Sequence, residues 1–304
     1  MSGGEVKILN SLSENGGEML QSDLVRQSGL SRSRTSEIIS SLEKKSLVSR
    51  FPLGKNYRVV LETEARTRRR RLRIGFTRSA EYPFIVPFRK HMRDDLGIKV
   101  HLQYYENGLD VARDLSLSRL DLGIAPIIAG FMFCSLGAPF KIIAPAGSGG
   151  SSIVTAKREH SSSQPKVATT KLSTMELLLK TSIHEHFLPD ESEAIYASSP
   201  QDIVNGIVSN RFDAACIWEP YATLLAKKRG FSRIVNYSDI EEHICCALSA
   251  NNQLDDRSIS KIKKKFTESI QEFSKYPDRY IDQYSRVVGF DENTIRQVPH
   301  RNVR

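Results

Sequence analysis

The chain has 304 residues, of which 39% are hydrophobic and 26% are charged. That length has room for about two domains, and the hydrophobic fraction is enough for a packed core, which excludes wholesale disorder. No apolar run approaches the roughly 18 residues of a membrane span, and the N-terminus MSGGEVKILNSLSENGG lacks the apolar core of a signal peptide. We therefore expect a cytoplasmic protein with no membrane partner.

Positive charge is concentrated near the N-terminus. Residues 1 to 73 contain fifteen Lys and Arg against eight Asp and Glu, so they carry seven of the nine net positive charges. A small basic segment joined to a nearly neutral one suggests that the first binds a polyanion. We predict an N-terminal domain over 1–65, a basic linker over 66–71 within the run RTRRRRLR, and a second domain over 72–304. The arginine run by itself suits a solvated linker without a role, whereas beside a polyanion-binding segment it could add phosphate contacts. We favour a linker with an auxiliary electrostatic role.

The N-terminal pattern predicts three short helices and a hairpin. Ile8, Leu9 and Leu12 mark the first helix, and residues 21 to 28 form the second, which Gly29 ends. Ser31 can cap a third helix whose residues Thr35, Ile38, Ile39 and Leu42 face inward. LVSRFPLGKNYRVVLE then predicts two strands around a Gly-Lys-Asn turn. The outward face of the third helix and the hairpin tip carry residues that suit a major groove and its phosphates, namely Arg32, Ser33, Arg34, Ser36, Glu37, Ser40, Arg50, Lys55, Tyr57 and Arg58.

Residues 5 to 61 resemble the winged helix-turn-helix of archaeal and bacterial regulators, and SDLVRQSGLSRSRTSEIISSLEKKSLVSR carries the resemblance. Ser46 stands where such sequences usually have glycine, which weakens the turn into the wing. The resemblance implies double-stranded DNA as a partner and, because tight operators are usually read by two-fold dimers, a homodimer or higher even oligomer. The alternative is a small helical domain that binds proteins.

From Leu72 onward, strands and helices alternate, which predicts an α/β fold with a mostly parallel sheet. SRLDLGIAP at 118–126 and NRFDAACIWEP at 210–220 repeat one pattern: a helix end, Arg, an apolar residue, Asp, and a buried strand that ends in proline. Asn107 with Gly108 opens the helix before the first copy, and Ser199 with Pro200 opens the helix before the second. Two equivalent units imply two lobes that share a cleft.

This second portion resembles the type 2 periplasmic-binding-protein fold, in the branch that binds nitrate, sulfonates, taurine and thiamine-pyrimidine precursors. The matching pieces include LRIGFTRSAEYPFI, AGSGGSSIV and SSPQDIVNGIVSNRFDAACIWEPYA. The resemblance, with strand-end positions such as Trp218, places ligand-binding residues in the cleft: Thr77, Ser79, Tyr82, Asn107, Ala125, Pro126, Ser148, Gly149, Gly150, Ser151, Ser173, Thr174, Trp218 and Glu219. Hydroxyls and helix N-termini favour an anionic or polar ligand. Two alternatives remain: Trp218 is ordinary core packing, and SGGSS is a flexible inter-lobe linker.

These parts together predict a ligand-responsive transcriptional regulator with a small-molecule effector. The alternative is a cytoplasmic enzyme of the same fold, similar to a thiamine-pyrimidine synthase or a chorismate dehydratase. We predict no catalytic residue and no cofactor. We predict no metal site either, because the cysteines at 134, 216, 245 and 246 fit no metal-ligand spacing and suit reduced packing thiols.

Overall fold

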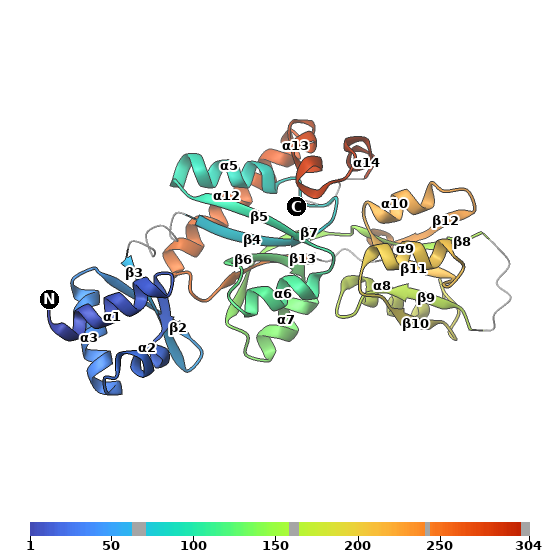
Figure 1. Cartoon of the computed structure of the whole chain (residues 1–304). Coiled ribbons are helices and arrows are strands. Elements are labelled where there is room, and N and C mark those ends of the chain that lie inside the picture. Colours follow the sequence, from blue (N-terminus) through green and yellow to red (C-terminus); the bar gives the residue numbers. More distant parts are fainter. Residues whose placement is uncertain (63–70, 158–163, 241–243, 299–304) are drawn as a thin grey trace.

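The computed structural model describes residues 1–62, 71–157, 164–240 and 244–298. Three sheets lie in a row, and each packs against its own helices (Figure 1). The predicted basic linker over 66–71 lies outside the described residues except for Arg71, which begins a strand. No described helix is both long and apolar enough to span a bilayer.

The N-terminal unit has the winged-helix arrangement. Its elements are α1 Gly3–Glu14, β1 Glu18–Leu20, α2 Gln21–Ser28, α3 Arg32–Lys44, β2 Val48–Leu53 and β3 Asn56–Leu61. The Ser31 hydroxyl accepts a hydrogen bond from Arg34 N at 3.2 Å and so caps α3. Thr35, Ile38, Ile39 and Leu42 are buried, as the helical spacing predicts. The wing is the antiparallel pair β2 and β3, which turns at Gly54.

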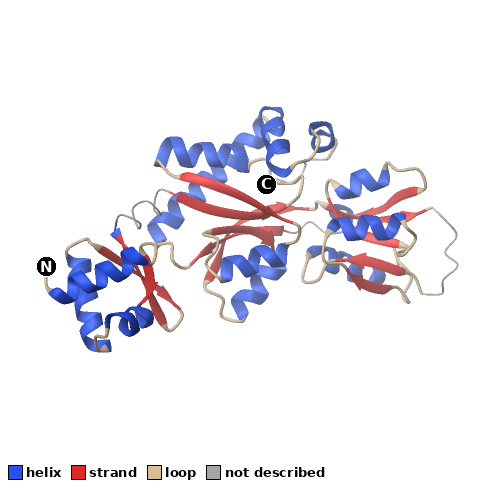
Figure 2. Ribbon diagram, in the orientation of Figure 1, coloured by secondary structure: helices blue, strands red, loops and turns tan. Residues whose placement is uncertain are grey.

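Lobe 1 is a five-stranded sheet in the order β5-β4-β6-β13-β7, with helices on both faces (Figure 2). Its strands are β4 Arg71–Thr77, β5 Lys99–Tyr105, β6 Leu122–Pro126, β7 Phe140–Ser148 and β13 Ile244–Asn251. Its helices are α5 Ile85–Leu96, α6 Gly108–Ser116, α7 Ile127–Ser135, α12 Asp256–Lys275, α13 Asp278–Val288 and α14 Glu292–Arg296.

Lobe 2 is a second five-stranded sheet, in the order β10-β9-β11-β8-β12. Its strands are β8 Ser151–Ala156, β9 Lys166–Thr169, β10 Glu193–Tyr196, β11 Ala214–Trp218 and β12 Phe231–Asn236. Its helices are α8 Thr174–His184, α9 Pro200–Val208, α10 Tyr221–Ala226 and α11 Tyr237–Ile240.

The two sheets repeat one topology. In lobe 1, β5, β4 and β6 are parallel neighbours, followed by the antiparallel β13 and then by β7. In lobe 2, β10, β9 and β11 are parallel neighbours, followed by the antiparallel β8 and then by β12. The antiparallel strand, β13 in lobe 1 and β8 in lobe 2, directly follows a crossing between lobes. The sequence repeat has a matching structural role, because Asp121 accepts a hydrogen bond from Arg73 N and Asp213 accepts one from Lys166 N. Each aspartate thus ties the strand that it precedes, β6 or β11, to that strand's parallel neighbour, β4 or β9.

Candidate functional site

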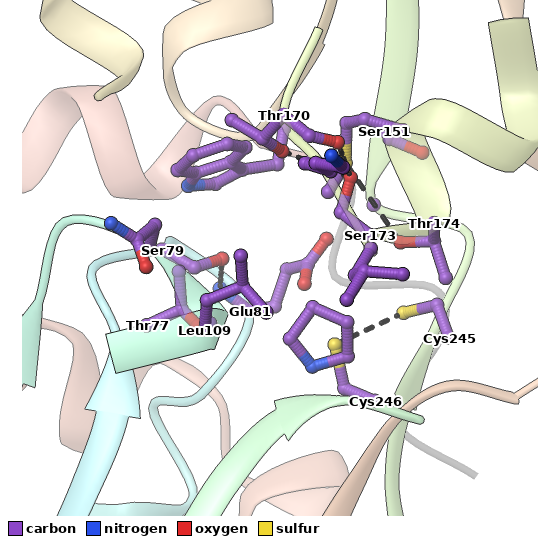
Figure 3. A pocket seen from close by; sticks show the side chains of 18 of the residues that line it. Thr77, Ser79, Glu81, Leu109, Ser151, Thr170, Ser173, Thr174, Cys245 and Cys246 are labelled. Atoms are coloured by element: carbon purple, nitrogen blue, oxygen red, sulfur yellow. Dashed lines mark hydrogen bonds between the residues drawn. The ribbon is translucent and has the colours of Figure 1, made fainter. Parts of the chain in front are cut away.

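A cavity of about 250 Å³ lies between the lobes. Lobe 1 supplies the end of β4 with the loop after it, the first turn of α6, the end of β6 and the start of β13 (Figure 3). Gly150 lies in the connection between the lobes, and the other lining residues come from lobe 2. The predicted residues that line it are Thr77, Ser79, Tyr82, Asn107, Pro126, Gly150, Ser151, Ser173, Thr174 and Trp218. A cavity of this size suits a small molecule.

The first turns of two helices face this cavity. Asn107 caps α6 by accepting from Asp110 N at 2.9 Å, and Ser173 caps α8 by accepting from Glu176 N at 3.3 Å. The other N–H groups of each first turn have no partner within their own helix. Gly108, Leu109, Thr174 and Met175 bring such groups to the cavity wall. Two positive helix ends therefore point toward the same space, which favours an anionic ligand group.

Thr77, at the end of β4, offers a free hydroxyl. Thr77 is only 7% exposed, and its Oγ1 has no hydrogen-bond partner among the described residues. A buried hydroxyl without a partner costs free energy, so it is a position where a ligand can supply the missing bond. Figure 3 places Thr77 beside Ser79, whose hydroxyl accepts from Glu81 N at 3.1 Å.

Trp218 joins the lobes as well as lining the cavity. It ends β11, is 4% exposed, and donates from Nε1 to the Arg78 carbonyl oxygen of lobe 1 at 2.8 Å. Its ring meets Tyr221 edge-on at 5.8 Å, and Tyr221 meets Phe290 in the same way. Phe290 packs against the cores of both lobes. Trp218 therefore combines the packing role and the cavity role that its sequence position left open.

The segment between β7 and β8 likewise has both of the roles that the sequence left open, as a linker between lobes and as part of the cavity wall. Residues 149–150 connect the lobes, as a linker would, and Gly150 and Ser151 line the cavity. A Cβ on Gly150 would lie 0.9 Å from a carboxylate oxygen of Glu81, so any larger residue here would force the Glu81 side chain to move.

Four residues of the predicted ligand-binding set lie outside the cavity lining: Ala125, Ser148, Gly149 and Glu219. Ala125 packs in the α6 region of lobe 1. Glu219 is 3% exposed and already engaged, because its Oε1 accepts from Arg233 at 2.6 Å and its Oε2 accepts from Thr223 N at 3.0 Å. Its carboxylate anchors α10 and β12 rather than facing a ligand.

Sequence reasoning missed five lining residues with titratable side chains: Glu81, Asp110, Lys171, Cys245 and Cys246. Glu81 lies in the loop after β4, and the two cysteines lie in β13. Burial raises the pKa of Glu81 to about 8, and the Glu219 carboxylate acts in the same direction. In the sequence, the cysteine pair lies in an apolar run and therefore indicated only core packing. Its place beside the cavity depends on the pairing of β13 with β6, a long-range contact that local patterns do not show.

A second concave surface lies on the N-terminal unit, between α2, α3 and the wing tip. Seven of the predicted DNA-binding residues line it: Arg32, Ser33, Ser36, Glu37, Ser40, Lys55 and Tyr57. Gln21, Ser22, Arg26, Lys44 and Asn56 line it without having been predicted. Arg34, Arg50 and Arg58 lie outside this lining. Each of these arginines forms a salt bridge with an acidic residue. Arg34 pairs with Glu37 at 3.0 Å, and Arg58 pairs with Glu18 at 3.9 Å. Arg50 is in close contact with Glu43.

Comparisons with solved structures give the fold of the two-lobed portion. The aliphatic sulphonate binding protein of Escherichia coli is 18% identical with a TM-score of 0.61, and the match covers 75% of this chain and 77% of that one. The alkanesulfonate-binding protein of Xanthomonas axonopodis, bound to MOPS, is 15% identical with a TM-score of 0.65, covering 75% and 83%. The nitrate-binding protein of Synechocystis PCC 6803 is 13% identical with a TM-score of 0.63, covering 74% and 68%. The first and third are described as periplasmic binding proteins, and all three share the architecture of the two-lobed portion, so the predicted fold of the second portion is confirmed.

Two different family models match the N-terminal unit and the two-lobed portion. Residues 2–62 match a domain of unknown function, DUF7343. A search of curated proteins gave no match. Residues 65–283 match the NMT1-like family, and this span is well over half of the chain. The chain therefore belongs to the NMT1-like family.

Proposed function

We propose that this protein is a transcriptional regulator in which a small polar or anionic molecule, bound between the two lobes, controls DNA binding by the N-terminal winged helix. The observation that carries the proposal is one chain with two different concave surfaces. One is a small cavity between lobes, and the other is an open surface around the third helix and wing. As a regulator of DNA, the protein would act in the cytoplasm.

The ligand class follows from the cavity wall. The first turns of α6 and α8, the Thr77 hydroxyl and the Ser151 side chain supply donors, and Trp218 and Leu109 supply apolar surface. Donors of this kind suit a compact anionic or polar group, and the aromatic face suits an attached apolar part. Among the relatives, the alkanesulfonate-binding protein was solved with MOPS, a molecule with such a combination. We propose a ligand of the same general chemistry.

DNA binding is proposed for the surface around α3. Arg32, Ser33 and Ser36 lie on the outward side of its first turns, and Lys55 with Tyr57 lies at the wing tip. Short polar side chains and arginine read base edges in a major groove, while a basic hairpin contacts the neighbouring phosphates. The positive excess of the N-terminal quarter supports the same proposal.

We further propose that the regulator acts as a homodimer or higher even oligomer, because one winged helix buries little surface on DNA. Multi-angle light scattering at micromolar concentration, with and without a cognate duplex, tests this. A strictly monomeric species in both conditions would contradict it.

The central experiment is mass spectrometry of small molecules released from the natively purified chain. We expect a compound with an acidic or strongly polar group, present in the wild type and reduced in Thr77→Val, which keeps the shape but lacks the hydroxyl. Tyr276→Phe on α12's exposed C-terminal end serves as a matched control and should retain the compound. An empty wild-type protein that also ignores candidate sulfonates would contradict the proposed sensor.

A further inference from the structure

Three potential metal ligands meet on the lobe 1 side of the cavity. One carboxylate oxygen of Glu81 and the Sγ atoms of Cys245 and Cys246 all lie within 4.8 Å of one another. The residues come from two segments, the loop after β4 and the start of β13, and only the fold brings them together. In Figure 3 the two sulfurs lie close together on the same side of the cavity as Glu81.

The two cysteines share one side of the sheet because β13 is irregular there. In a regular strand, neighbouring side chains point to opposite faces. The register between β13 and β7 shifts on both sides of Cys246, between Ile244 and Cys246 and between Cys246 and Ala247. The Sγ atoms consequently approach to 3.5 Å. Bulges of this kind often re-aim a side chain at a functional site.

The sulfur separation suits a tetrahedral ion. Two thiolates bound to Zn²⁺ at about 2.3 Å in tetrahedral geometry are separated by about 3.8 Å, so a small adjustment from the 3.5 Å seen here suffices. A linear two-coordinate ion would need the sulfurs on opposite sides of the metal. A donor set of two thiols and one carboxylate is typical of borderline ions such as Zn²⁺ rather than of Mg²⁺ or Ca²⁺.

The surroundings complete the case for a cation. No basic side chain forms an ion pair with Glu81 within the described ranges, and the one lining residue that carries a positive charge there, Lys171, lies on lobe 2. A partly buried carboxylate without a basic partner is stabilised by a proton or a bound cation. The Tyr82 hydroxyl donates to Cys246 Sγ at 3.0 Å, which is the kind of outer hydrogen bond that orients and stabilises a thiolate ligand.

From these observations we propose that Glu81, Cys245 and Cys246 bind a thiophilic divalent metal ion of the Zn²⁺ class, with Tyr82 as the outer partner of Cys246. All four residues line the cavity. The remaining coordination position therefore faces the cavity, where water or a ligand's anionic group can occupy it. The site stands on this geometry alone and does not depend on DNA binding.

Co²⁺ titration of the full chain tests the proposal, after purification under reducing conditions and removal of metal with a chelator. We expect one Co²⁺ to bind with a thiolate charge-transfer band and tetrahedral d–d bands, and Zn²⁺ to displace it. Cys245→Ser with Cys246→Ser should abolish the charge-transfer band. Glu81→Gln should keep the band, because both thiolates remain. It should weaken Co²⁺ affinity by at least about tenfold, since losing a residue that only hydrogen-bonds to a metal ligand already costs about that much. Cys134→Ser, which alters a thiol outside the cavity lining, should leave titration unchanged.

X-ray absorption of the zinc-loaded wild type gives a check that needs no variant. Two sulfur neighbours at about 2.3 Å with oxygen neighbours at about 2.0–2.2 Å are expected. The proposal is overturned by a wild type without a charge-transfer band, by an unchanged band in a folded double-serine variant, or by a zinc spectrum with only oxygen and nitrogen neighbours.

Discussion

Glu219 shows how a conspicuous residue can serve structure rather than recognition. Its buried carboxylate depends on Arg233, whose side chain is 24% exposed. Arg233→Met should therefore lower the free energy of unfolding by about 3 kcal/mol, the lower end for breaking a buried ion pair, because it leaves the carboxylate uncompensated. Urea denaturation followed by circular dichroism measures the change.

The double variant Glu219→Gln with Arg233→Met is the matched control, because it removes both charges. It should recover most of the lost stability. A single variant as stable as the wild type would mean that solvent already screens this pair.

Ser46 carries a conformational cost that the sequence comparison with winged helices indicates. Its φ is 53°, in the left-handed region that favours glycine. Ser46→Gly should raise the free energy of unfolding of the N-terminal unit by up to about 1 kcal/mol, since relief of strain exceeds the added chain entropy. Hydrogen exchange of α3 and β2 amides measures it. Ser46→Ala retains the strain and should bring no gain, and equal gains in both variants would refute the explanation.

At the scale of elements, much of the fold could be predicted from local signals. Helical spacing at Ile38, Ile39 and Leu42, and the repeated Asp121 and Asp213 patterns, are short-range features of the sequence. Strand exchange was not predictable in this way: β13 returns to lobe 1 after the whole of lobe 2 and pairs there with β6 and β7, far back along the chain. The Glu81 and Cys246 contact depends on that exchange and on a bulge, so no spacing rule could find it.

The element that we expect to read DNA is α3, with the wing beside it. Arg32→Ala should weaken binding to an operator selected from a random duplex library by about 1–3 kcal/mol, and Lys55→Ala should reduce the salt dependence of binding by about one phosphate contact. Fluorescence anisotropy across a salt series measures both quantities. Lys7→Ala, an exposed lysine of α1 outside the concave surface, is the control and should bind normally. Equal affinity of the Arg32 variant and this control would remove α3 from its proposed role.

At the scale of the whole molecule, the contacts between lobes suggest how, in the proposed regulator, ligand binding would reach the N-terminal unit. Trp218 Nε1 donates to Arg78, Ala80 N donates to the Glu219 carbonyl, and Asn107 Nδ2 donates to the Ser198 carbonyl. Contacts of this kind are made when the lobes are close together. A ligand that touches both lobes would stabilise this arrangement only by its differential affinity for it. The first strand of lobe 1, β4, follows the N-terminal unit in the chain. In the dimer that we propose, lobe movement would therefore change the separation of the two winged helices.

Trp218 provides the measurement for that coupling because it is the only tryptophan in the chain. Titration with the molecule recovered from the native protein should change Trp218 emission and DNA affinity along the same saturation curve. Trp218→Phe keeps an aromatic ring but loses the Nε1 hydrogen bond to Arg78, so calorimetry should find ligand affinity reduced about fivefold, the effect of about 1 kcal/mol for one neutral hydrogen bond. Its DNA affinity without ligand should equal that of the wild type, because the winged helix is a separate packed unit. If this variant lost its fold, the main role of Trp218 would be core packing rather than ligand binding. Normal ligand binding by the wild type without any change in DNA affinity would refute the regulatory mechanism while leaving the cavity a binding site.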